Sequence, residues 1–139
     1  MPRFAATRTL GAPPGDVWAV LADPATFPAW WPGIDHVEAG RQGLAPAARW
    51  QLPGPDRPSL LRRPQTTGTL LVLAVAPPSR LAFQLTGDRV DVEVELRPLD
   101  DGRTEASLVV DAPSLSGIRR SFPAQVLGRL ESLVAGKGA

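Results

Sequence analysis

Hydrophobic and polar residues alternate through much of the chain in a way that predicts β-strands. The alternation is most regular at 90–97, where apolar side chains alternate with charged ones. A period of two places successive side chains on opposite faces of a strand, so this segment predicts a half-buried strand. Further strands are predicted at 3–10, 34–39, 48–52, 81–86 and 106–112. Short turns join most of these segments, and this arrangement predicts an antiparallel sheet.

The segment 66–76 also predicts a strand, but it is apolar on both faces. In an antiparallel sheet one face commonly meets water, so the outer side chains of such a strand need another cover. We therefore expect a homodimer or a client protein on this edge of the sheet. The residues to be covered belong to one of two sets, Leu71, Leu73 and Val75 or Leu70 and Val72.

The C-terminal part of the chain changes to a helical period. Its apolar residues recur every three or four positions: Leu115, Ile118, Phe122, Val126, Leu130 and Leu133. Such a stripe predicts an amphipathic helix with one apolar face. Pro123 lies inside the stripe, so it should either kink the helix or make 116–122 a separate turn.

Two short helices are predicted after the first strand. Val17, Val20 and Leu21 recur at helical spacing, behind prolines that suit a first helical turn. Asp23-Pro24 then begins a second helix with a capping aspartate, and Pro32-Gly33 ends it. Three of the four tryptophans of the chain lie in this stretch.

The residues of this helix pair carry a resemblance to a known superfamily. The run from Val17-Trp18 through Asp23-Pro24 and Phe27-Pro28 to Trp30-Trp31-Pro32-Gly33 resembles the opening of the START-like superfamily. This superfamily, also called SRPBCC, includes the polyketide cyclase/dehydrase and birch-pollen-allergen-like proteins. The resemblance implies an α+β helix-grip fold, in which a curved antiparallel sheet of about six or seven strands wraps around a long C-terminal helix. It also implies a deep internal pocket.

Composition narrows the function classes. At 139 residues, the chain fits a single domain over 1–139. The formal net charge is +1, whereas dedicated nucleic-acid binders usually carry a basic stripe. No run of about 18 apolar residues predicts a membrane span, and the N-terminus lacks the apolar core of a signal peptide. We therefore expect a cytoplasmic protein without a nucleic-acid partner.

A sheet that is wider than its one long covering helix should leave an apolar space between the two. We expect this space to bind a hydrophobic or amphipathic small molecule, such as a lipid, a quinone or a polyketide-like compound. The small Gly68, Ala106 and Ala112 favour empty volume there. Each expected lining residue would serve equally well as plain core. These residues are Trp31, Trp50, Leu71, Phe83, Leu85, Val92, Val94, Leu108, Ile118, Phe122 and Val126.

Candidate catalytic chemistry is sparse in this sequence. The chain has no cysteine and no tyrosine, and His36 is its single histidine. His36 and Glu38 share a face of a short predicted strand, which is too few ligands for a metal site. Arg49 is the best lone cation for anchoring an anionic head group, although alternation turns it away from Trp50. Since no phosphate-binding or dinucleotide motif occurs, we expect no metal, no cofactor and no catalytic residue.

Three further interpretations stay open beside binding or transport. The first is a cyclase or dehydratase that works mainly by shaping a polyketide-like substrate, with Arg49 and His36 as residues to test. The second is the homodimer or protein-interaction module proposed above. The third is quinone or lipid handling at a membrane surface, as in coenzyme-Q-binding relatives. It rests on the proline-rich loop 53–64, which offers Leu60-Leu61 beside Arg62-Arg63. The same loop is open to two other interpretations, a ligand entrance or a stiff loop in solvent.

Overall fold

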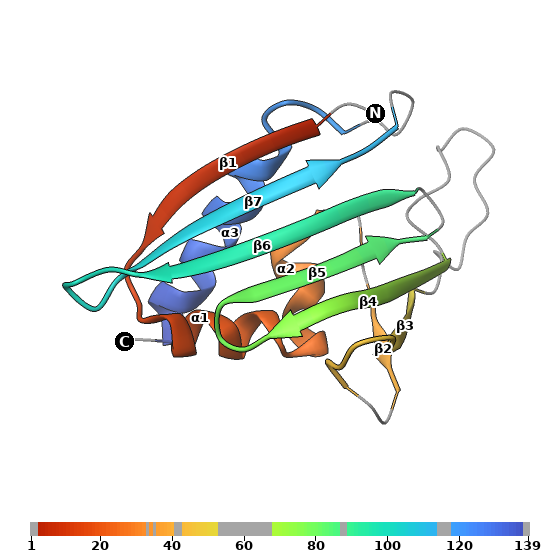
Figure 1. The fold of residues 1–139 in the computed structure, drawn as a ribbon, viewed down its shortest axis with the longest axis horizontal. Helices are drawn as coiled ribbons and strands as arrows, with labels where there is room; N and C mark the ends of the chain where they lie inside the picture. Colours follow the sequence, from red (N-terminus) through yellow and green to blue (C-terminus); the bar gives the residue numbers. More distant parts are fainter. Residues whose placement is uncertain are drawn as a thin grey trace.

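The structure, a computed structural model, describes residues 3–32, 34, 36–40, 43–52, 68–86, 89–113 and 118–137. Within these ranges a seven-stranded antiparallel sheet carries helices on one face (Figure 1). The first half comprises β1 (Arg3–Leu10), α1 (Pro14–Leu21), η1 (Pro24–Thr26), α2 (Phe27–Trp30), β2 (Glu38–Ala39) and β3 (Arg49–Leu52). The second half comprises β4 (Gly68–Ala76), β5 (Arg80–Leu85), β6 (Val90–Pro98), β7 (Thr104–Asp111) and α3 (Phe122–Lys137).

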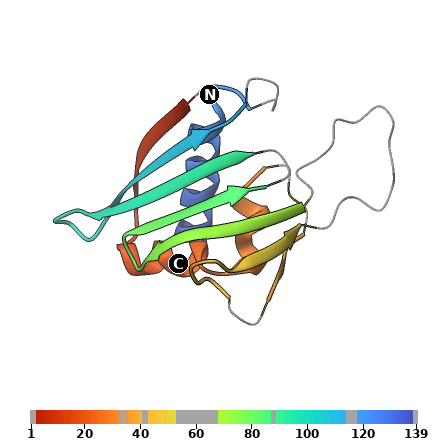
Figure 2. The same ribbon diagram turned by 45° about the vertical axis from the view of Figure 1, so that its right-hand side comes forward.

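The strands follow the order β1-β7-β6-β5-β4-β3-β2, and every neighbouring pair is antiparallel. α3 packs on β1 and β7, at one side of the sheet, and also contacts α1 and α2. Figure 2 shows the sheet as one curved layer with the helices behind it. The predicted α+β helix-grip architecture is therefore confirmed, with one strand before the helix pair and six after it.

The helix pair forms largely as its sequence predicts. Asp23 caps the second segment, since its side chain accepts a hydrogen bond of 3.0 Å from the backbone N–H of Ala25. Pro28 lies in the first turn of α2, where the missing N–H would have no helical partner, and a 3₁₀ turn precedes this helix. Thr26 Oγ1 donates to the carbonyl of Val20 at 2.6 Å and so ties η1 to α1.

Two predicted boundaries change. Among the described residues of the strand expected at 34–39, only Glu38–Ala39 pair with β3. The start of the C-terminal helix also differs, since α3 begins at Phe122 and Pro123 lies in its first turn. A proline there costs no hydrogen bond, so the helix needs no kink. The expected loop 53–64 lies outside the described residues.

β4 contains an irregularity between Val72 and Ala74 that its uniformly apolar sequence did not reveal. Before it, Val72 pairs with Phe83 and points into the core; beyond it, Val75 pairs with Leu81 and packs against the core. A bulge changes which residues face each side of a strand. The expected grouping of Val75 with Leu71 and Leu73 is therefore wrong.

The outward apolar residues of β4 are Leu71 and Leu73. Leu71 pairs with Arg49 on one side and with Gln84 on the other. Leu73 is 50% exposed, and it is the exposed large hydrophobic residue of the described chain. A homodimer or client protein on this face stays a prediction.

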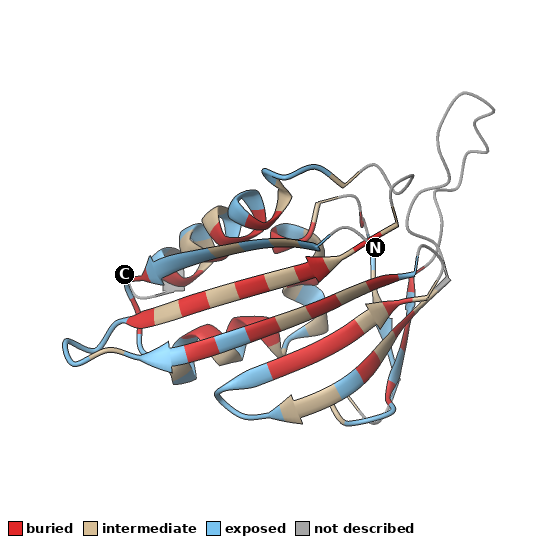
Figure 3. Cartoon of the chain, turned by 45° about the horizontal axis from the view of Figure 1, so that its top comes forward, coloured by how far each residue is buried: buried red, intermediate tan, exposed pale blue. Residues whose placement is uncertain are grey.

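The core is a single cluster between the sheet and the helices. Buried residues alternate with more exposed ones along β6 and β7, as Figure 3 shows. The buried polar side chain among the described residues is Thr104, whose Oγ1 donates to the carbonyl of Ala12 at 2.7 Å. This hydrogen bond fixes the connection between β1 and α1 against β7.

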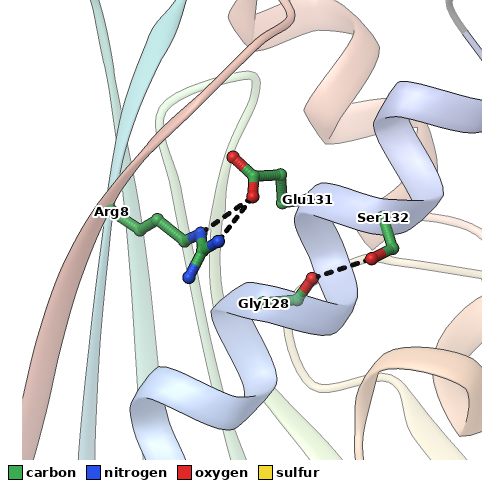
Figure 4. A network of polar contacts seen from close by, with 4 residues as sticks. All are labelled: Arg8, Gly128, Glu131 and Ser132. Carbon is green, nitrogen blue, oxygen red and sulfur yellow. Dashed lines mark hydrogen bonds and ion pairs between the residues drawn. The ribbon is translucent and has the colours of Figure 1, made fainter.

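α3 is tied to β1 by an ion pair on the surface (Figure 4). Arg8 Nη2 donates to Glu131 Oε1 at 2.6 Å, and Arg8 Nε donates to the same oxygen at 3.1 Å. Gly128 lies one helical turn before Glu131, and its carbonyl accepts a hydrogen bond from Ser132 Oγ. A Cβ added at Gly128 would come no closer than 3.8 Å to Arg8 Nη1, which is ordinary contact.

We expect Gly128→Ala to raise the free energy of unfolding by about 0.5–1 kcal/mol, because glycine inside a helix is that much less favourable than alanine. Urea denaturation measures the change. Gly102→Ala is the control, since Gly102 has a φ of 79° in the turn between β6 and β7 and alanine there is strained. The control should lose stability, and a loss at Gly128 as well would contradict the expectation.

Candidate binding site

Aromatic side chains gather where the helix pair meets β3 and β5. Six rings form one contiguous cluster, with neighbouring ring centroids between 4.7 and 6.3 Å apart. They come from α2 and the residue after it, from two strands and from the first turn of α3. The six are Phe27, Trp30, Trp31, Trp50, Phe83 and Phe122.

Phe27 lies at the centre of this aromatic cluster. It stacks on Trp31 with an interplanar angle of 11°, at a centroid distance of 6.0 Å. It meets Trp30, Trp50 and Phe83 edge to face, which is a favourable arrangement for ring quadrupoles. α2 is only four residues long, so these contacts, rather than its own hydrogen bonds, hold it in place.

A small void lies at one side of the aromatic cluster. Its volume is about 10 Å³, which is room for one water molecule at most. Every lining side chain is apolar or aromatic, and none carries a titratable group. The lining residues are Leu21, Phe27, Trp30, Leu44, Trp50, Leu70, Leu81 and Phe83. As it stands, this void is far smaller than the pocket that the sequence led us to expect.

Leu44 lines the void from a segment without regular structure. The segment 43–48 has Gly43 and Ala47 in the left-handed region, with φ of 60° and 68°. Its backbone is held by the N–H of Ala47, which donates to the carbonyl of Val72 at 2.8 Å. Leu44 itself is only half-buried, unlike the other aliphatic residues that line the void. Leu44 is therefore the least enclosed residue of the lining.

Two tryptophans of the aromatic cluster differ in their polar contacts. Trp50 Nε1 donates to the carbonyl of Gly43 at 2.8 Å, which fastens the segment that carries Leu44. Trp30 Nε1 is buried and has no hydrogen-bond partner among the described residues. An unpaired buried N–H is unusual, because most such groups in folded proteins are satisfied.

The predicted lining residues divide into three groups in the structure. Eight of them are buried in the core: Trp31, Trp50, Phe83, Leu85, Val92, Val94, Leu108 and Val126. Ile118 and Phe122 are partly buried and pack against the core. Leu71 was expected on the inner face, but it lies on the outer face opposite Arg49 and Gln84, so its assignment to a lining is wrong.

Only Trp50 and Phe83 from that prediction line the void. The sequence reasoning missed its other six lining residues: Leu21, Phe27, Trp30, Leu44, Leu70 and Leu81. Some signals were present, because Phe27 and Trp30 stand in the superfamily-like opening and Leu81 alternates with Phe83. Leu44 gave no signal, since it lies in a stretch that has no helical or strand period.

The two candidate polar anchors lie on the surface. Arg49 is exposed on β3, next to the buried Trp50, and neither it nor His36 lines the void. His36 Nε2 lies 3.6 Å from Glu38 Oε1, and both side chains are mostly exposed. Within the described residues, no three histidine or acidic side chains are grouped as metal ligands would be.

Charged side chains instead form ion pairs on the outer face of the sheet. Arg80 Nη2 lies 3.1 Å from Glu93 Oε2, and Arg97 Nη2 lies 2.8 Å from Glu105 Oε1. The hydrogen bond from Arg80 holds the pKa of Glu93 below its usual range. These ion pairs join neighbouring strands on the outer face of the sheet, and none of their residues lines the void. In the part of the chain that is described, no helix is long and apolar enough to cross a membrane.

Solved structures share this fold at low sequence identity. EF2215 from Enterococcus faecalis, a conserved protein of unknown function, is 21% identical with a TM-score of 0.69, over 99% of this chain and 73% of that one. NE0264 from Nitrosomonas europaea is 17% identical with a TM-score of 0.71, over 98% of this chain and 96% of that one. CalU16 from Micromonospora echinospora is 18% identical with a TM-score of 0.66, over 98% of this chain and 78% of that one.

No curated protein matches the sequence. A family model does, and it covers residues 1–135, which is nearly the whole chain. The fold, the helix pair and the apolar interior agree with that match. The chain belongs to the polyketide cyclase/dehydrase and lipid transport family.

Proposed function

We propose that the protein binds a hydrophobic or amphipathic small molecule at the void beside the aromatic cluster, beneath Leu44. The observation that carries this proposal is the void itself, an apolar gap lined by leucines and aromatic rings, of which Leu44 is the half-buried one. Small-molecule sites in proteins are mostly lined by apolar and aromatic side chains with few polar groups. The membership of a family that includes lipid transport supports the same function.

Ligand binding must enlarge the void. Typical ligand pockets measure about 300–1,000 Å³, far more than the 10 Å³ of the void. The segment 43–48 is the part of the lining proposed to move, since it has no regular structure and its Leu44 is only half-buried. Hydrogen bonds of Ala47 and Ala48 with Val72, and of Trp50 with Gly43, hold its two ends. Binding is therefore proposed to move Leu44 outward and to place the ligand against Trp30, Trp50 and Phe83.

Binding or transport is preferred over catalysis. The side chains that line the void provide no acid, base or nucleophile, and their polar groups are the two indole N–H groups of Trp30 and Trp50. A cyclase or dehydratase would have to work by shaping its substrate alone. Membrane-surface handling of quinones or lipids stays a prediction, because residues 60–63 lie outside the described part of the chain.

Titration with tetralin, a small bicyclic hydrocarbon, tests this function. We expect saturable binding that shifts the indole N–H signals of Trp30 and Trp50 in a ¹H–¹⁵N spectrum. Leu44→Trp should weaken the binding at least about tenfold, because its larger side chain fills the void. Leu73→Trp is the matched control, since it makes the same change on the outer face and should bind like the wild type.

Two results would overturn the proposal. If tetralin and comparable apolar probes produce no saturable shift in the wild type, the protein has no such site. If Leu44→Trp and Leu73→Trp weaken binding equally, the ligand does not bind beneath Leu44. The tryptophan fluorescence maximum of each variant shows whether the new indole is buried or exposed.

A further inference from the structure

The unpaired indole of Trp30 is the least explained polar group in the described core. Trp30 is 1% exposed, and its Nε1 has no hydrogen-bond partner among the described residues. Trp50 provides a comparison within the same cluster, since it is equally buried and its Nε1 donates to the carbonyl of Gly43. The fold therefore satisfies one of these two donors and leaves the other without an acceptor.

Such a donor costs free energy unless something else provides an acceptor. A phenylalanine at position 30 would keep most of the ring and avoid this cost. A water molecule is a poor partner here, because buried waters usually need two to four polar contacts. The side chains that line the void are apolar apart from the two indoles, and Trp50 already uses its own N–H. The missing acceptor is better supplied by a molecule that enters the void.

We propose that Trp30 Nε1 donates a hydrogen bond to the bound molecule. The ligand is then an apolar body that carries an acceptor oxygen, as ketones, quinones and esters do, rather than a pure hydrocarbon chain. Trp30 lines the void, so a molecule that occupies the void contacts this side chain. This inference rests on the proposed function and deepens it, since it assigns a ligand chemistry and a recognition residue.

The test compares 1-tetralone with tetralin, which have the same bicyclic frame and differ by one carbonyl group. Dissociation constants for both are measured with the wild type and with Trp30→Phe. Wild-type protein should prefer the ketone, and Trp30→Phe should reduce this preference by roughly two- to tenfold, the value of one neutral hydrogen bond. Trp18→Phe is the matched control. It makes the same change at a partly buried tryptophan that does not line the void, so the preference should be kept.

A second measurement needs no variant. In the wild type, the indole proton of Trp30 should move downfield when 1-tetralone is added, because a new hydrogen bond deshields it. Tetralin should not produce this downfield movement. The indole proton of Trp50 should stay hydrogen-bonded with both probes.

The outcomes separate this inference from the proposed function. If neither probe binds, the proposed function fails, and this inference fails with it. If both probes bind but Trp30→Phe leaves the preference unchanged and the Trp30 proton does not move downfield, the function stands and the role of Trp30 is overturned. If Trp18→Phe loses the preference as Trp30→Phe does, the effect does not come from an indole at the void, which also overturns the role of Trp30.

Discussion

Trp31→Ala is expected to lower the free energy of unfolding by about 3–5 kcal/mol. Trp31 is 1% exposed, and its ring contacts Phe27, Phe83 and Phe122. These partners belong to α2, β5 and α3, so the truncation leaves a cavity where three elements meet. The surrounding rings are rigid and cannot close it fully, which adds to the lost burial. Chemical denaturation, with the midpoint and slope fitted together, measures the loss.

Trp18→Ala is the control for this prediction. Trp18 lies on α1, is only partly buried and packs at the margin of the core. The same atoms are removed, but the position borders on solvent, so we expect less than about half of the loss at Trp31. Equal losses at the two positions would mean that the aromatic cluster is no better packed than the margin, and our account of α2 would be wrong.

The sheet could be predicted from the sequence because its pattern has a simple physical origin. One face of each strand packs on the core and the other meets water, so apolar and polar residues alternate, as Val90, Val92 and Val94 do along β6. The resemblance of the opening helix pair then supplied the topology. Family membership over residues 1–135 agrees with that interpretation.

The inward face of a strand could not be predicted where apolar and polar residues do not alternate. β4 is apolar along its whole length, so nothing in its sequence says which residues face inward. The irregularity between Val72 and Ala74 changes which residues face inward before and after it. Leu71, before it, pairs with Arg49 on the outer face. Only the pairing with β3 and β5 decides this, and that pairing is a tertiary property.

The candidate site was harder to predict than the fold for a related reason. A leucine that lines a void and a leucine in solid core look alike in a sequence, and Leu44 lies outside any periodic segment. The unpaired state of Trp30 Nε1 is likewise invisible, because it depends on which carbonyls the fold brings near. Sequence reasoning identified the tryptophan-rich stretch, but it could not distinguish the roles of Trp30 and Trp31.

The C-terminal helix gives the second large prediction. The sequence stripe included Leu130 and Leu133 but left out Leu127, whereas the structure buries Leu127 to 1% and leaves Leu133 only partly buried. The buried face of α3 includes Leu127, Leu130 and Val134, at the spacing of three and four that a helix requires. We therefore expect Leu127→Ala to lower the free energy of unfolding by about 2–5 kcal/mol, measured by chemical denaturation.

Leu133→Ala makes the same chemical change six residues later on the same helix, so helix propensity is matched and only burial differs. Its expected loss is clearly smaller, because part of the side chain is already exposed and little cavity forms. The two stability losses thus show which face of α3 packs against β1 and β7. A larger loss at Leu133 than at Leu127 would mean that α3 is rotated about its axis relative to this structure. The original stripe, rather than the observed face, would then describe the core.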